Sequence, residues 1–269
     1  MSAVALLNIS ELAVLEEARQ ARAVAAVADV VEPLAGGLLS FTGPGSYSNQ
    51  AVGLGMSGPV SGPELDQLCT VYESRGFQPQ IELCPYAHET LIRGLAVRGF
   101  VIKDFETVLA RDMSVPLDAE IPTGIQITQV NPADEEQVET FLKIVADGFS
   151  VTNRDIFRAH ARKVLHYPNT YAYIASIDGT PAAGGSCELS APCGALFGMS
   201  TLENFRNRGL QRALMIVRLK AAQQSNCKYV TIGSKPDSAT GRNALRLGFQ
   251  VAYTKAILIK PGAGLLSSP

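Results

Sequence analysis

The chain has 269 residues, 46% of them hydrophobic and 18% charged, so it can bury the core of one large domain or of two ordinary ones. A net charge of −2 and a pI near 6.0 argue against a general nucleic-acid-binding protein, which normally presents a basic face. The five cysteines are scattered and nowhere spaced as CxxC, which indicates reduced thiols and no metal site.

The alanine-rich N-terminal region predicts a helix. Ser10 is its expected N-cap, and the amphipathic pattern continues to about Val31. Acids and arginines recur throughout "SELAVLEEARQARAVAAVADVV", so this segment fits neither a signal peptide nor a membrane span. We therefore expect a cytoplasmic protein that binds no membrane.

The rest of the first half alternates strands and helices. Pro63 and Gly76 mark the expected start and end of one helix. The predicted elements are strands at 36–43 and 49–58, a helix at 61–76, a strand at 78–84, a helix at 87–99 and a long strand at 100–113.

Residues 114–124 contain two prolines and show no periodicity, as is typical of a linker. The sequence thus predicts two domains, covering residues 1–113 and 125–269.

The second half repeats the alternation. Asn131 is the expected N-cap of its first helix, with Pro132 at the first helical position, and the dipeptide Asp178-Gly179 favours a tight hairpin turn. The predicted elements are a strand at 125–130, helices to about 147 and at 153–166, a hairpin within 170–189, a strand at 194–202, a helix at 210–225, a strand at 228–234, a helix at 238–248 and closing strands through 259. This pattern predicts a mixed α/β sheet.

The two halves share short motifs in the same order. "GMS" at Gly55 and at Gly198 closes a strand before a helix, and "RGF" at Arg98 and "LGF" at Leu247 close a later helix. The glycines of these motifs lie 44 positions apart in the first half and 50 in the second. The order indicates an ancestral duplication.

The additional length falls in the loop before the helix that begins near Leu210. Arg206, Arg208 and Arg212 surround Gly209 there. A helix N-terminus has unpaired N–H groups and a partial positive charge, so cations are unfavourable beside it unless an anion is bound. Arginine at an exposed helix start is often only solvated, but three of them around a glycine favour a pyrophosphate site.

Two other phosphate-binding patterns fit the sequence less well. The chain contains no Gly-x4-Gly-Lys-Ser/Thr, so a P-loop is excluded. Residues 53–58, "GLGMSG", match G-x-G-x-x-G, and Glu82 lies in the next strand as a ribose-binding acid could. However, Pro59 and Pro63 delay the following helix beyond the third glycine, which favours a simple glycine-rich turn.

The order of strand, Arg206-Asn207-Arg208-Gly209-Leu210-Gln211, helix, strand and helix ending in Gly-Phe resembles the GNAT superfamily of N-acetyltransferases. The resemblance covers residues 124–260. Its loop departs from the common Gln/Arg-x-x-Gly-x-Gly/Ala only at Gln211. The first half resembles a degraded second copy, so the expected fold is two GNAT-like mixed-sheet domains in tandem, the second complete and the first reduced.

The resemblance implies acetyl-CoA as co-substrate, no metal, and direct attack by an amine in a ternary complex. Pantetheine would lie along Phe197–Leu202. The implied cofactor-binding residues are Met199, Ser200, Thr201, Arg206, Asn207, Arg208, Gly209, Leu210, Gln211, Arg212 and, where the family often has an asparagine, Asp237 or Ser238.

The catalytic groups are less clearly marked. An amine of pKa about 10.4 is mostly protonated at pH 7, so a base is needed. Glu188 and Glu203 are the candidates, although each is more often a solvated carboxylate. Cys187 as an acyl-enzyme nucleophile is less favoured than a buried apolar role. Many family members have a tyrosine acid four residues before the final Gly-Phe; that position is Ala244 here, with Tyr253 or Ser238 as substitutes.

Two functions follow from the resemblance. The first is an N-acetyltransferase for a small-molecule amine or amino acid derivative, monomeric or homodimeric, with the first copy shaping the acceptor pocket. The second is a catalytically silent CoA-binding scaffold, which Ala244 favours. Aminoacyl transfer from tRNA is disfavoured by the acidic pI.

Overall fold

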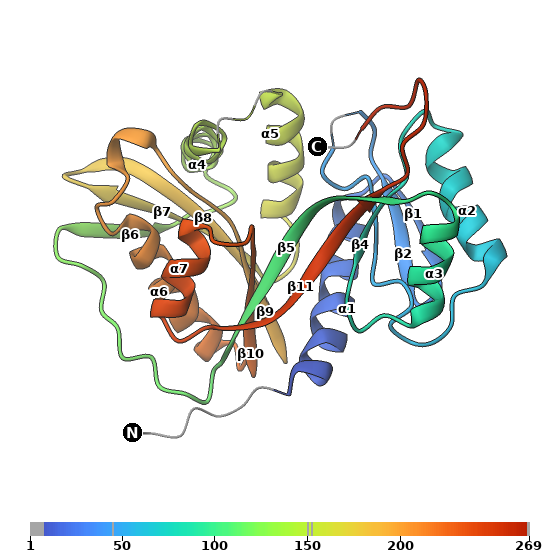
Figure 1. Ribbon diagram of the computed structural model, residues 1–269. Coiled ribbons are helices and arrows are strands. Elements are labelled where there is room, and N and C mark those ends of the chain that lie inside the picture. The colour runs from blue at the N-terminus through green and yellow to red at the C-terminus, as the bar shows by residue number, and fades with distance from the viewer. Residues whose placement is uncertain (1–7, 45, 150, 152, 268–269) are drawn as a thin grey trace. The chain divides into compact units, whose positions relative to one another are not determined.

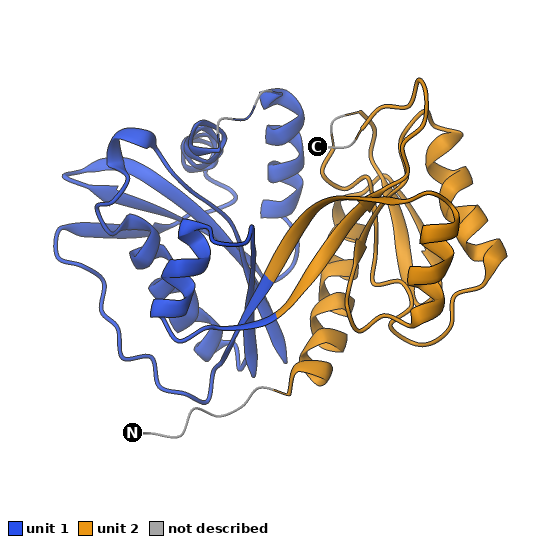
Figure 2. Ribbon diagram, viewed as in Figure 1, with its two compact units in different colours: residues 1–7, 108–252 blue, residues 8–107, 253–269 orange. Residues whose placement is uncertain are grey.

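The computed structural model describes residues 8–267 except 45, 150 and 152. The chain adopts a mixed α/β fold (Figure 1). Its helices and strands gather into two compact units (Figure 2). Unit 1 contains residues 108–252, and unit 2 contains residues 8–107 together with the segment that begins at Tyr253.

Unit 2 has a five-stranded arrangement β1-β2-β3-β4-β11, in which β11 (Gln250–Ile259) belongs to this unit from Tyr253 onward, and β5 lies beside β11. Strands β3 and β4 are parallel, through Ala51 and Ile81, whereas the pairs β1-β2, β2-β3 and β4-β11 are antiparallel. Helices α2 and α3 cover the buried core formed with these strands, and α1 packs on β2 and β3. The elements are α1 (Ile9–Val27), β1 (Val30–Leu34), β2 (Gly37–Phe41), β3 (Gln50–Val52), α2 (Gly62–Glu73), β4 (Gln80–Leu83), α3 (Glu89–Val97) and β5 (Val101–Asp112).

The start of unit 2 differs from the sequence prediction. The N-cap of α1 is Asn8, whose side chain accepts from the Glu11 N–H, and the helix ends at Val27. Val30 and Val31 belong to β1, which forms a hairpin with β2. The turn of this hairpin is Ala35-Gly36, both with positive φ. Alanine rarely adopts this conformation, so the sequence did not indicate a hairpin turn at this dipeptide. The predicted helix therefore included residues up to Val31 that belong to β1.

Unit 1 has the strand order β5-β10-β9-β8-β7-β6. The elements are β6 (Ile125–Gln129), α4 (Glu135–Gly148), α5 (Arg154–Leu165), β7 (Thr170–Ile177), β8 (Thr180–Ser190), β9 (Cys193–Thr201), a 3-10 turn (Glu203–Phe205), α6 (Leu210–Gln224), β10 (Tyr229–Ser234), α7 (Ala239–Arg246) and β11 (Gln250–Ile259). One core lies between the sheet and α6 and α7, and a second between the sheet and α4 and α5.

Two local predictions for unit 1 have different outcomes. The hairpin at Asp178-Gly179 is confirmed, since both residues have positive φ and join β7 to β8. The N-cap of α4 is Asp134, whose carboxylate accepts from Glu136 and Gln137 N–H groups. Asn131 instead accepts from the Ala133 N–H in a turn before the helix.

The compact units do not begin and end at the ends of strands. The last residues of β5 belong to unit 1, and the last residues of β11 belong to unit 2, where they pair with β4. Residues 114–124, the predicted linker, form no helix or strand. Leu117, Ala119 and Ile121 nevertheless pack against the core of unit 1, so this segment is fixed to that unit.

Within the described residues, no helix is long and apolar enough to cross a membrane.

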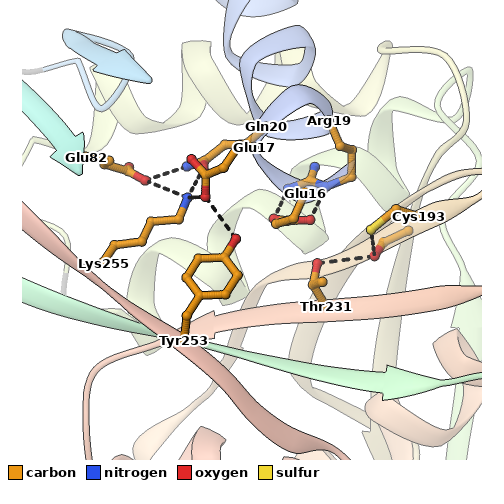
Figure 3. A network of polar contacts seen from close by, with 10 residues as sticks. Glu16, Glu17, Arg19, Gln20, Glu82, Cys193, Thr231, Tyr253 and Lys255 are labelled. Atoms are coloured by element: carbon orange, nitrogen blue, oxygen red, sulfur yellow. Dashed lines mark hydrogen bonds and ion pairs between the residues drawn. The ribbon is translucent and has the colours of Figure 1, made fainter. Parts of the chain in front are cut away.

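Unit 2 contains a buried cluster of charged and polar side chains (Figure 3). The Lys255 Nζ atom lies 2.8 Å from Glu17 Oε1 and 3.3 Å from Glu82 Oε2, and the lysine side chain is 1% exposed. The Tyr253 hydroxyl donates to Glu17 Oε1 at 2.9 Å, and Gln20 bridges Glu82 and Lys255. Burial opposes the charge on Lys255, but Glu82 and Glu17 outweigh it and raise the lysine pKa.

This cluster makes Lys255 a stability determinant of unit 2. We expect Lys255→Met to lower the free energy of unfolding by about 3–5 kcal/mol, because the variant leaves buried carboxylates without their cation. Urea denaturation measures the loss. Lys260→Met is the matched control: Lys260 is also near the end of the chain, but its pair with Glu73 is partly exposed, so about 0–1 kcal/mol is expected. Equal losses in the two variants would contradict this account.

Candidate functional site

The start of α6 carries the features expected of an anion site. Gly209 is the N-cap, with φ +83°, and no side chain caps the helix. The first turn contains no acidic residue. The first N–H groups of α6 therefore have no side-chain acceptor, and the helix dipole adds partial positive charge at the same place. Asn207 also has positive φ, so two left-handed residues shape this loop.

Three guanidinium groups surround this helix start. Arg206 donates to the carbonyls of Thr201 at 3.4 Å and Gly148 at 3.3 Å, and Arg212 donates to the Glu120 carbonyl at 3.3 Å. Arg208 lies over the Phe205 ring and 3.4 Å from the exposed Asp178 carboxylate. Most of these bonds are to neutral carbonyls and are long, so the positive charge is little compensated within unit 1.

Strand β9 precedes this loop, and its pairing with the neighbouring strand β10 stops before β9 ends. Its parallel pairing with β10 runs from Cys193 and Tyr229 to Leu196 and Ile232. Both strands continue beyond these residues, β9 to Thr201 and β10 to Ser234. The backbone of β9 after Leu196 thus has polar groups outside the β10 ladder, which suits an extended amide-containing ligand.

The same part of β9 contains a bulge. Ser186 of β8 faces Phe197, and Gly184 faces Ser200, so one residue of β8 lies opposite two of β9. The first of these two is Gly198, with φ +57°, as in a bulge that requires a left-handed glycine. The bulge changes the direction of the backbone groups at the predicted pantetheine segment.

Two side chains of that segment already have partners within the protein. Met199 is buried and its sulfur accepts from Arg218 at 2.7 Å. The Ser200 hydroxyl donates to the carbonyls of Ile144 and Val145 at the end of α4. The backbone of Thr201 pairs with Ala183, and its carbonyl accepts from Arg206. Any contact of Met199 or Ser200 with a cofactor would therefore use the backbone.

The other predicted cofactor residues divide between α6 and α7. Leu210 is buried in the core, so only its N–H is suited to a ligand. Gln211 donates to Thr240 and accepts from Asn243, which joins the two helix starts. Ser238 is the N-cap of α7, accepting from the Gly241 N–H, and Asp237 pairs with Arg242. The structure therefore gives Asp237 and Ser238 local structural roles.

Helix α2 of unit 2 begins in the opposite way. The Ser61 side chain accepts from the Glu64 N–H, and the Glu64 carboxylate accepts from the Ser61 N–H, in a capping box. An acid thus occupies the first turn of α2. Nine residues separate Val52, at the end of β3, from Gly62, at the start of α2, so the helix does not begin inside the glycine motif of residues 53–58. Glu82 belongs to the buried charged cluster, so the dinucleotide-site reading gains no support.

The catalytic candidates lie in different surroundings. Glu188 is buried on β8, opposite Ala195 of β9 and two positions from Ser186 at the bulge. Glu203 is exposed at the start of the 3-10 turn. Tyr253 belongs to unit 2, where its hydroxyl is bonded to Glu17 and where burial, followed by the Glu17 charge, raises the pKa of the phenol.

Ala244 and Cys187 are both fully buried in the core beside α6. A tyrosine at position 244 would have to displace well-packed neighbours, which supports the packing explanation for the alanine. Burial raises the pKa of the Cys187 thiol to about 12, and this keeps it as an unreactive thiol.

One residue of this region was not predicted. Arg218, in the third turn of α6, is fully buried and contacts the bulge of β9. Its position on the apolar face of α6 was the only available signal, because a buried arginine cannot be told from a solvated one by residue type.

Comparison with known proteins relates the part of the chain that contains this site to a known family. Residues 136–249 match the model of the acetyltransferase (GNAT) family. This range runs from the start of α4 past the end of α7 and contains the loop at residues 206–212. This part of the chain is therefore a GNAT acetyltransferase domain, and the resemblance inferred from the loop is confirmed for it. No curated protein sequence matches the chain.

Solved structures extend the likeness to nearly the whole chain. A GCN5-related N-acetyltransferase from Kribbella flavida has a TM-score of 0.72 at 18% identity, covering 96% of this chain and 98% of that one. A functionally unknown conserved protein from Staphylococcus epidermidis has a TM-score of 0.62 at 12% identity, covering 87% and 94%. A tandem GNAT protein from the clavulanic acid biosynthesis pathway has a TM-score of 0.60 at 12% identity, covering 96% and 88%. The predicted GNAT-like mixed α/β fold is confirmed.

Among the described residues, no group of His, Cys, Asp and Glu side chains is placed to hold a metal ion.

The burial of the thiols yields a prediction about covalent chemistry. All five cysteines are buried and none forms a disulfide. We expect a disulfide reagent such as 5,5′-dithiobis(2-nitrobenzoate) to label none of them rapidly in the native protein and all five in denaturant. Absorbance of the released thiolate measures this. Rapid native labelling at Cys187, located by peptide mass spectrometry, would instead support an acyl-enzyme nucleophile.

Proposed function

We propose that the protein is an acetyl-CoA-dependent N-acetyltransferase acting on the amine of a small molecule or an amino acid derivative. The observation that carries this proposal is the uncapped start of α6. It follows a strand that has left its parallel neighbour and is surrounded by Arg206, Arg208 and Arg212. Residues of this kind suit a pyrophosphate that continues into an extended pantetheine arm.

The cofactor assignment follows from these positions. N–H groups of Leu210, Gln211 and Arg212 would bind the pyrophosphate, assisted by the three guanidinium groups. Backbone groups from Phe197 to Thr201 would hold pantetheine and polarise the thioester carbonyl. Acetyl-CoA supplies the activated acetyl group. Unit 2 has a self-capped helix at the corresponding place, so we assign cofactor binding to unit 1 alone and regard unit 2 as a reduced copy.

The reaction forms a bond between the amine nitrogen and the acetyl carbon and breaks the bond between that carbon and sulfur. The amine must first lose a proton, which for a lysine-like amine at pH 7 costs about 4.6 kcal/mol. Glu188 is the better placed of the two unit-1 carboxylates, because it lies on β8 near the bulge, and a water relay is the simplest route to it. CoA leaves as a thiolate of ordinary pKa about 8.5 and takes its proton from solvent.

A CoA-binding scaffold without activity is the second candidate. It is favoured by the core position of Ala244, which replaces the usual acid, and by the bond of Tyr253 to Glu17 in unit 2. Slow thiolate departure is compatible with an enzyme, because a thiolate leaves without an acid more readily than an alkoxide does.

The arginine loop provides a binding test. We expect Arg208→Gln and Arg212→Gln each to weaken CoA binding by about tenfold, since each removes a cation beside the proposed pyrophosphate. Calorimetry measures the affinity. Arg246→Gln, in the last turn of α7, removes an exposed arginine of the same unit and should leave the affinity unchanged. Equal effects of the three variants would indicate general electrostatics and no specific site.

Turnover separates the enzyme from the scaffold. Acetyl-CoA is incubated with a panel of primary amines, and released CoA thiol and acetylated amine are measured together. We expect one acetylated amine for each CoA released with at least one acceptor, and faster turnover between pH 7 and 9 as the amine loses its proton. Tight CoA binding without transfer to any amine would contradict the acetyltransferase proposal and favour the CoA-binding scaffold.

A further inference from the structure

Arg218 is a cation buried in the core of unit 1 without an acidic partner. It is 0% exposed. Its guanidinium donates to the carbonyls of Leu214 at 2.9 Å, Ser186 at 2.7 Å and Phe197 at 3.4 Å, and to the Met199 sulfur at 2.7 Å. No carboxylate of the described chain is among these partners. Burial lowers the pKa of Arg218 to about 10, so the group stays charged at neutral pH.

The partners of Arg218 lie around one structural feature. Ser186 and Phe197 face each other at one end of the β9 bulge, and Met199 lies within the bulge. The guanidinium occupies space left by Gly185, where an added Cβ would lie 3.1 Å from it. Arg218 therefore ties the two strands together at the point where their register shifts.

Stability alone does not account for this arrangement. A buried charge costs several kcal/mol to desolvate, and apolar side chains of similar volume often replace buried ionic groups without loss. Carbonyl partners compensate the cost only partly. A planar group with five donors does, however, fix several backbone carbonyls in one geometry, which neither lysine nor an apolar side chain can do.

We propose that Arg218 is a positioning residue that holds the bulge of β9 in the shape needed to receive the pantetheine arm of CoA. The inference rests on the proposed function, because it concerns the same cofactor site. Arg218 acts from behind the strand, through Phe197 and Met199, and does not touch the cofactor. The pyrophosphate loop at residues 206–212 lies at the start of α6, about two turns before Arg218, and the bonds of Arg218 run to Leu214, Ser186, Phe197 and Met199 outside that loop.

This separation allows a test by two ligands. CoA contains the pantetheine arm, and 3′-phospho-ADP is the same nucleotide without it, so the ratio of their affinities measures what the arm contributes. In Arg218→Met we expect this ratio to fall by about tenfold or more while the affinity for 3′-phospho-ADP changes by less than about twofold. Calorimetry gives both constants without requiring turnover.

Arg218→Lys covers the case in which the methionine variant does not fold. It keeps the charge but not the planar fork, and a smaller fall in the same ratio is expected. Hydrogen exchange of the ligand-free lysine variant should also show faster exchange in residues 197–201 than in the wild type, as expected if the bulge has loosened. An unchanged ratio together with unchanged exchange would overturn the proposal.

Arg111→Met is the matched control. Arg111 is also buried in unit 1 and donates to the backbone carbonyls of Leu247, Val115 and Pro116, away from β9. Its loss should lower stability and leave the affinity ratio unchanged. A similar fall in ratio for Arg111→Met would show a general effect of core loosening and overturn the assignment of Arg218. If the wild type binds neither ligand, the proposed function is wrong and this inference is wrong with it. If the wild type binds CoA, the results for the variants test the role of Arg218 alone.

Discussion

The early end of pairing between β9 and β10 is the constraint on which the site depends. Parallel strands normally continue to satisfy each other's backbone groups, but here the ladder stops after Leu196 and Ile232 while both strands go on. The bulge at Gly198 then turns the free edge, and the chain enters α6 without a side-chain cap. Unpaired backbone groups along a strand and at a helix start thus follow one another, which is the order in which CoA presents its pantetheine and pyrophosphate.

The two units treat the start of the corresponding helix in opposite ways. In α2 the orphan N–H groups are satisfied by Ser61 and Glu64, which also brings a negative charge to the dipole. In α6 no side chain caps these groups, and arginines add positive charge. The capping box of α2 is therefore the reason why the proposed cofactor binding is assigned to unit 1 alone.

Buried cations also receive different partners in the two units. Lys255 is compensated by the carboxylates of Glu17 and Glu82, an arrangement that costs stability when either sign is removed. Arg218 instead donates to neutral carbonyls and a sulfur, so no negative charge neutralises it beside the proposed thioester strand. The first arrangement stabilises a core, whereas the second holds a backbone shape.

The sequence by itself determined most of the element order and the hairpin at Asp178-Gly179, and it marked the loop around Gly209 as a candidate anion site, because these depend on local features: periodicity, turn dipeptides and the grouping of arginines. The hairpin at Ala35-Gly36 was missed since its turn residues are unusual, and the cap of α4 was misplaced because several polar residues compete there. Only the tertiary structure decided that Tyr253 is bonded to Glu17, that strand ends of β5 and β11 are exchanged between units, and that Arg218 is buried under the bulge. These features join residues far apart in the chain, and neither residue type nor spacing encodes which distant groups will satisfy a buried charge or an unpaired strand.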